Sequence, residues 1–160
     1  MDQPERGDRL RLAKRMVTML ERVQAMVRGE APGPPVAGLV GFHVVAVEPG
    51  RAVFEMEAGP QHANPMGTLH GGILCDIADA AMGIAYASTL EEGESFTTLE
   101  LKINFLKPVW NARLRAEGHV VKRGRRVGLV ECDVVDETGS LVARASSTCL
   151  TLSGKEAAGR

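Results

Sequence analysis

Apolar and polar residues alternate over several stretches of this chain, and the alternation predicts β-strands on both sides of one long helix. The first two strand-like runs, 42–48 and 52–58, are joined by a Pro-Gly turn and predict a hairpin. The remaining runs lie at 97–105, 112–122, 126–136 and 141–152, and glycine-bearing turns separate the last three of them. Pattern alone therefore predicts an α+β domain in which a helix covers an antiparallel sheet of about five or six strands.

The helix between these strands is apolar on nearly every face from 73 to 87, and such a helix is normally buried. Asp76 and Asp79 interrupt it, and helical spacing places both on one face with Gly72 and Gly83. Burying an unpaired carboxylate costs on the order of several kcal/mol or raises its pKa. We therefore expect at least one of the two to have a function, although a structural hydrogen bond would also explain it.

A second, amphipathic helix is predicted near the N-terminus, where apolar residues recur at positions 10, 13, 17, 20, 23 and 27. Its polar face mixes charges of both signs and it lacks aromatic anchors, which argues against a membrane-surface helix. A Pro- and Gly-rich segment follows it. The expected division is an N-terminal helix and linker (1–35), a main domain (36–153) and a disordered tail (154–160).

Composition narrows the classes of function. With 19 Lys and Arg against 20 Asp and Glu, the net charge of −1 gives no general attraction to nucleic acid or membranes. No apolar run has transmembrane length, and the charged N-terminus lacks a signal core. Cys75, Cys132 and Cys149 lie in apolar contexts without metal-ligand spacing, which favours reduced core thiols. We expect a cytoplasmic protein that needs no metal or separate cofactor.

Candidate chemistry concentrates at the start of the apolar helix. Gly71 and Gly72 occupy its first turn, where backbone N–H groups lack helical partners and could polarise a carbonyl oxygen. Asp79 could supply the base or nucleophile, but helical rise places it about 12 Å further along the axis. Because that gap is long for one acyl group, the spacing predicts a site completed by a second subunit.

The pattern Asn64…His70-Gly71-Gly72…Asp79 resembles the signature of the hotdog-fold thioesterases. The resemblance is to the phenylacetic-acid-degradation (PaaI-like) and thioesterase-superfamily-member-2-like branch, and it covers about residues 36–152. It implies a hotdog fold, in which an antiparallel sheet wraps around one long central helix. It also implies an acyl-CoA thioesterase that releases a free acid and CoA, with CoA as part of the substrate.

The resemblance implies roles residue by residue. Asp79 acts as general base on water or as nucleophile, and the N–H of Gly71 donates to the thioester oxygen. Asn64 helps to hold the water or the carboxylate, and His70 orients the loop and the thioester. Local explanations remain open, because His70 could cap the helix and Asn64 could belong to a turn.

A Ser or Thr across the dimer interface assists the water in this family, and it corresponds to Thr98, with Thr97 as the near alternative. Simple alternation places Thr97 on the face of Leu99 and Thr98 on the other, and both threonines also suit a strand without any function. The family forms its active site between two subunits, which implies a homodimer. A tetramer made of two dimers is its common state.

The basic run 122–126 is a further candidate, although a solvated hairpin tip explains it equally well. The phosphates of CoA need cations, and arginine binds them through charge-assisted, often bidentate bonds. Related enzymes place CoA phosphates near comparable segments, so Arg125 and Arg126 become expected substrate contacts.

Two other functions stay open from the sequence. One is a hotdog hydratase or dehydratase acting on enoyl or 3-hydroxyacyl thioesters, and the other is a non-catalytic acyl-CoA-binding module. The Asn64-Pro65 pair is faintly similar to the hydratase motif, but the Asp before it and the Ile-His after it are missing. The residues do not distinguish an aromatic from an aliphatic acyl group.

Overall fold

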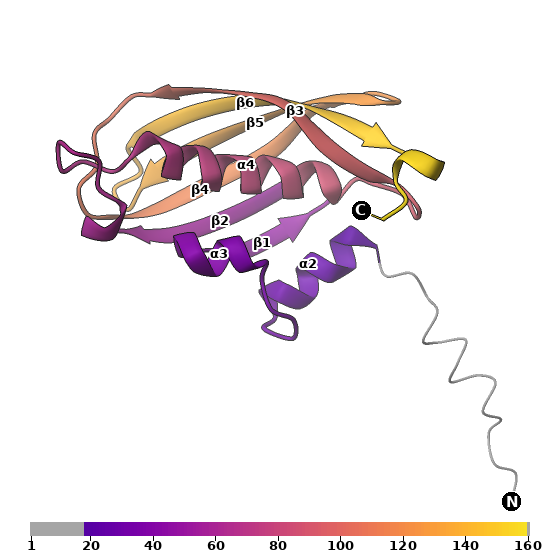
Figure 1. Cartoon of the computed structure of the whole chain (residues 1–160), viewed down its shortest axis with the longest axis horizontal. Coiled ribbons are helices and arrows are strands. Elements are labelled where there is room, and N and C mark those ends of the chain that lie inside the picture. The colour runs from indigo at the N-terminus through magenta and orange to yellow at the C-terminus, as the bar shows by residue number, and fades with distance from the viewer. Residues whose placement is uncertain (1–17, 160) are drawn as a thin grey trace, which may run out of the picture.

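The computed structural model describes residues 18–159 and consists of a curved sheet with one long helix lying against it (Figure 1). Positions 10–17 of the predicted N-terminal helix lie outside the described residues. The elements are α2 (Met19–Val27), α3 (Pro35–Val40), β1 (Phe42–Glu48), β2 (Arg51–Ala58), η1 (Pro60–His62), α4 (Gly71–Ala87), β3 (Ser95–Phe105), β4 (Ala112–Arg123), β5 (Val127–Asp136), β6 (Leu141–Leu152) and η2 (Gly154–Glu156).

All the strands belong to one antiparallel sheet with the order β1-β2-β4-β5-β6-β3. The chain leaves β2 at one side of the sheet, passes through α4 and returns as β3 at the far edge (Figure 1). This path lays α4 across the concave face, against β2, β4 and β5. The wrapped helix and the six strands confirm the hotdog fold that the resemblance implies.

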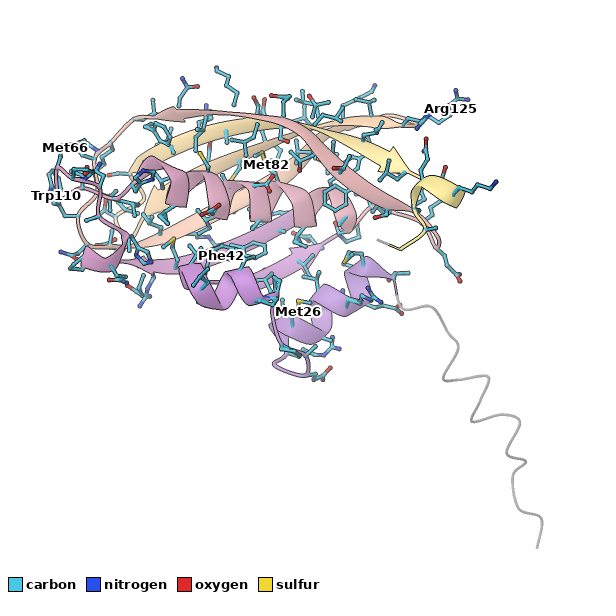
Figure 2. All side chains as sticks on the ribbon, viewed as in Figure 1. Met26, Phe42, Met66, Met82, Trp110 and Arg125 are labelled. Atoms are coloured by element: carbon cyan, nitrogen blue, oxygen red, sulfur yellow. The ribbon has the colours of Figure 1, made fainter. Side chains whose placement is uncertain are left out.

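Two glycines in the sheet explain how closely α4 approaches it. A Cβ on Gly118 would lie 2.5 Å from the carbonyl group of Ala81, so only glycine lets the helix backbone pass there. A Cβ on Gly128 would lie 2.3 Å from the ring of Tyr86, whose hydroxyl shares a 2.7 Å hydrogen bond with Thr151. The inner face of α4 is thereby buried, as Met82 between helix and sheet illustrates (Figure 2).

A β-bulge in β3 changes which residues face the helix. The register with β6 shifts between Thr98 and Glu100, and Thr98 pairs with Cys149, which is 1% exposed in the core. Residues on the helix side are therefore even-numbered before the bulge and odd-numbered after it, and Leu99 is exposed. The simple alternation expected from the sequence is wrong at this point. A bulge inserts one extra residue into the strand, and the strand propensities of the residues do not indicate where it falls.

The N-terminal region adds two short helices beside β1 (Figure 1). Helix α2 confirms the predicted helix over the part that is described, and Thr18 and Glu21 close its first turn as a capping box. Helix α3 was not expected, because six residues are too few to show a period. It begins with Pro35 and is capped after Val40 by Gly41, which has a φ of 93°.

The C-terminal segment includes the turn η2, within the stretch that the sequence leads us to expect disordered. Glu156 in this turn pairs with Arg126 at 2.9 Å. The division of the chain into linker, main domain and tail stays a prediction.

Candidate active site

The first turn of α4 is closed by His70, which is the N-cap residue. Its Nδ1 accepts a hydrogen bond from the Gly72 N–H at 2.9 Å, so this nitrogen carries no proton. A Cβ on residue 72 would lie 2.9 Å from the same nitrogen. Gly72 was expected to contact the substrate, but in this structure its donor is already used within the chain.

Gly71 presents a different environment. Within residues 18–159 its N–H has no hydrogen-bond acceptor. The ring of Phe105 lies against its Cα, since a Cβ added there would be 2.8 Å from Cζ of that ring. Phe105 is itself 55% exposed. The ring of Phe105 thus lies beside the first turn of α4, and the sequence reasoning missed this residue although it ends the inward-facing series of β3.

Asn64 organises the loop that leads into α4. Its Oδ1 accepts from the N–H groups of Met66 at 2.9 Å and Thr68 at 3.2 Å, and its Nδ2 donates to Thr68 Oγ1 at 2.8 Å. His62 fixes the same loop, because its Nε2 lies 2.8 Å from the carbonyl oxygen of Val40. The structure does not bring Asn64 to Asp79 within one chain.

Thr98 and Asp79 meet in the middle of α4. Thr98 Oγ1 donates to Asp79 Oδ1 at 3.2 Å, and both residues belong to the same chain. Asp79 is exposed, but part of the water around its carboxyl is displaced by the protein. This desolvation raises the pKa of the carboxyl above its ordinary value. The Thr98 bond opposes this rise and the nearby charge of Asp76 adds to it. Thr97 pairs with Leu150 on the opposite face of β3, away from Asp79.

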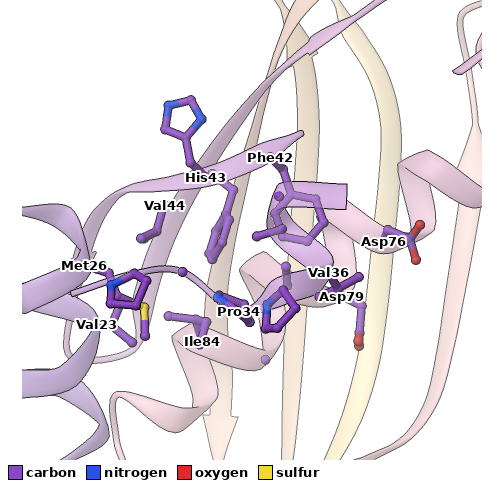
Figure 3. Close-up of a pocket in the computed structure, with 18 of the residues that line it drawn as sticks. Val23, Met26, Pro34, Val36, Phe42, His43, Val44, Asp76, Asp79 and Ile84 are labelled. Carbon is purple, nitrogen blue, oxygen red and sulfur yellow. The ribbon is translucent and has the colours of Figure 1, made fainter. Parts of the chain in front are cut away.

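A cavity of about 940 Å³ opens beside Asp79. Asp76 and Asp79 lie at one side of it, whereas Val23, Met26 and Ile84 lie at the other (Figure 3). Apolar side chains from α2, α3, β1 and β2 make up most of the wall, and small residues of α4 form part of its floor. The pocket therefore pairs a polar end, which carries Asp79 and Thr98, with a long apolar interior.

The predicted phosphate-binding arginines lie elsewhere. Arg125 is at the tip of the β4–β5 turn, at the opposite end of the molecule from Met66, whose loop leads into α4 (Figure 2). Arg126 is bound to Glu156, while Arg125 is exposed and has no hydrogen bond or ion pair to any residue in 18–159. Within one chain neither arginine reaches the first turn of α4.

Three comparisons with known proteins bear on this site. The family model of the thioesterase superfamily matches residues 66–143. The crystal structure of a phenylacetic acid degradation-related protein from Ralstonia eutropha is 36% identical, with a TM-score of 0.72, and the match covers 80% of this chain and 98% of that one. The chain belongs to the thioesterase superfamily.

Curated relatives of this thioesterase agree with the assignment. The 1,4-dihydroxy-2-naphthoyl-CoA hydrolase of Listeria monocytogenes is 30% identical over 103 residues, which are 64% of this chain and 84% of that protein. Human acyl-coenzyme A thioesterase 13 is 25% identical over 139 residues, 83% of this chain and 96% of the human one. The expectation of a PaaI-like thioester hydrolase is confirmed, whereas the roles of single residues stay predictions.

Two further observations concern metal binding and membrane-spanning helices in this thioesterase. In the part of the chain that the structure describes, no group of three or more His, Cys, Asp or Glu side chains is placed to hold a metal ion. Among the same residues, none of the helices has the length and apolar character needed to span a bilayer.

Proposed function

We propose that this thioesterase hydrolyses an acyl-CoA thioester to a free carboxylic acid and CoA. The observation that carries the proposal is the Asp79 carboxylate, held by Thr98 at the polar end of an apolar pocket. An apolar cavity with few polar groups is the usual form of a small-molecule site. The names of the Listeria and human relatives, which specify CoA thioesters, support CoA as the thiol part of the substrate.

The chemistry follows from the two kinds of group. Acting as general base, Asp79 takes a proton from water as the oxygen attacks the thioester carbon. The carbonyl oxygen then becomes an oxyanion, which the N–H of Gly71 stabilises, a type of contact worth about 3 to 4 kcal/mol in the transition state. The intermediate collapses, the C–S bond breaks and the CoA thiolate takes up the proton. Direct attack by Asp79 is the alternative route, and neither route uses a metal or another cofactor.

The two groups act together only across a subunit interface, because one helix holds them about 12 Å apart. Strand β3 is the sheet edge that both half-sites touch, through Phe105 beside Gly71 and Thr98 beside Asp79. The other edge, β1, lies beside α2. Antiparallel pairing of two β3 strands, in a register centred near Lys102, would bring Thr98 of each close to Phe105 of the other. We therefore propose a homodimer with two shared sites, which can pair further into a tetramer.

The same arrangement gives Arg125 a task. The pairing proposed for β3 places the two subunits side by side in opposite directions. The β4–β5 turn of one subunit then lies at the same end of the dimer as the first turn of α4 in the other. Arg125 has no partner among residues 18–159 and remains available for a CoA phosphate. The cytoplasmic location stays a prediction.

Asp79→Asn tests the catalytic role directly. Removing the base should lower kcat by about 10²- to 10⁴-fold, while binding of the acyl-CoA remains. Thiol release from a panel of acyl-CoA esters measures the rate, and calorimetry measures binding. Asp76→Asn is the matched control, because it removes a carboxylate from the same helix face and pocket and should retain most of the activity.

The same panel separates the rival functions. Water addition to enoyl-CoA without thiol release would identify a hydratase, and binding without any turnover would identify a binding module. Wild-type hydrolysis that survives Asp79→Asn would remove the proposed role of this residue.

A further inference from the structure

The pocket extends well beyond the core of the fold. Helix α2 supplies four of its lining residues, namely Met19, Val23, Met26 and Val27. The segment that follows α2 adds Gly29 and the run from Pro32 to Pro35. The end of the cavity far from Asp79 thus includes Val23 and Met26 of α2, which come before the sheet in the chain, together with Ile84 of α4.

This outer wall is anchored to the rest of the molecule. Val23 is 1% exposed and fixes α2 beside β1. The C-terminus of α2 is closed by the bond from the Glu30 N–H to the Ala25 carbonyl oxygen at 2.9 Å, with Gly29 at a φ of 71°. The wall therefore has a defined position relative to β1, and its side chains can limit what the pocket accepts.

The size of the cavity indicates the shape of the acyl group. Its volume of about 940 Å³ is near the upper end of the range of about 300 to 1,000 Å³ for pockets that hold drug-sized ligands. An aryl ring on a two-carbon arm would leave much of this space empty. A flexible aliphatic chain can follow the apolar lining from Asp79 towards Met26, whose unbranched thioether adapts to different chain ends.

We propose that α2 forms the far wall of the acyl pocket and that Met26 sets the longest aliphatic chain that the pocket admits. The proposal rests on the proposed function of the Asp79 site. Met26 lies beside Val23 and Ile84, across the pocket from the carboxylates (Figure 3). It is a specificity residue and touches the end of the chain, while the reacting carbonyl stays at the polar end.

The test compares chain-length profiles of Met26 variants. For saturated acyl-CoA esters from butyryl to palmitoyl, Met26→Trp should lower kcat/KM of the longest substrates by about tenfold or more and leave butyryl-CoA within about twofold. Met26→Ala, which removes most of the side chain and enlarges the pocket, should extend the profile towards longer chains. Arg22→Ala changes an exposed residue of the same helix outside the pocket and should leave the profile unchanged.

A binding experiment makes the result independent of hydrolysis. Calorimetry with thioether analogues of the same acyl-CoA esters should show the same loss for long chains in Met26→Trp and the same extension in Met26→Ala. If the wild type hydrolyses no ester, the proposed function fails, yet a chain-length shift in binding still supports the wall. Profiles that are identical in all variants, or changed equally at every length, would overturn the inference.

Discussion

The first turn and the middle of α4 are built in opposite ways. At the first turn Nδ1 of His70 and the side-chain amide of Asn64 are used within the chain, whereas the backbone N–H of Gly71 has no acceptor among residues 18–159. In the middle the backbone is satisfied by the helix, and the group left available is the side chain of Asp79.

Under the proposed mechanism, this difference means that neither region can act as an active site alone. An N–H at a helix N-terminus can stabilise negative charge but cannot remove a proton, whereas a carboxylate can remove a proton but repels an oxyanion. Hydrolysis needs both properties at one carbonyl. In the proposed mechanism, their separation along a single helix calls for a second copy of the chain.

Mixed dimers give the largest expected effect. Gly71→Pro should be almost inactive, because proline fits the first turn of a helix but removes the backbone N–H that would hold the oxyanion. Asp79→Asn should be almost inactive as well. Co-refolding the two in equal amounts should restore about a quarter of the wild-type rate, since half of randomly formed dimers are mixed and each holds one intact site of two.

Thiol release before and after mixing checks this result, and each variant mixed with itself is the control. No recovery from a mixture that exchanges subunits would show that both groups act within one chain. The comparison between the two regions would then need a different explanation.

The surroundings of Asp79 predict opposite shifts of the pH profile. Asp79 must be ionised to act, so activity should fall as the pH drops through its raised pKa. Thr98→Val removes a hydrogen bond that lowers this pKa, so the acid limb should move to higher pH. Asp76→Asn removes a charge that raises it, so the limb should move to lower pH.

Profiles of kcat/KM against pH for the wild type, Thr98→Val and Asp76→Asn measure these shifts. Gly71 variants with residual activity should keep the wild-type limb, because the first turn does not contact the carboxyl. Equal movement in Thr98→Val and Asp76→Asn would contradict the assignment of the limb to Asp79.

Sequence reasoning located the strands, the long helix and Asp79, because each leaves a periodic pattern or a charge in an apolar run. It did not place Thr97 and Thr98 on the correct faces, since the bulge in β3 breaks the alternation without a signal in composition. It also missed Phe105, whose role depends on the distance between β3 and the first turn of α4. Contacts between distant segments are set by tertiary packing, and one sequence does not reveal them.

His70 gives the smallest expected effect, and it separates a structural from a catalytic role. His70→Ala removes the N-cap bond and should lower the free energy of unfolding by about 0.5 to 2 kcal/mol. His70→Asn should restore most of that stability, because asparagine is a good N-cap residue. Urea denaturation measures both variants, and thiol release measures their activity. If His70→Asn is stable and active, capping accounts for His70; if it is stable but slow, the imidazole also orients the thioester.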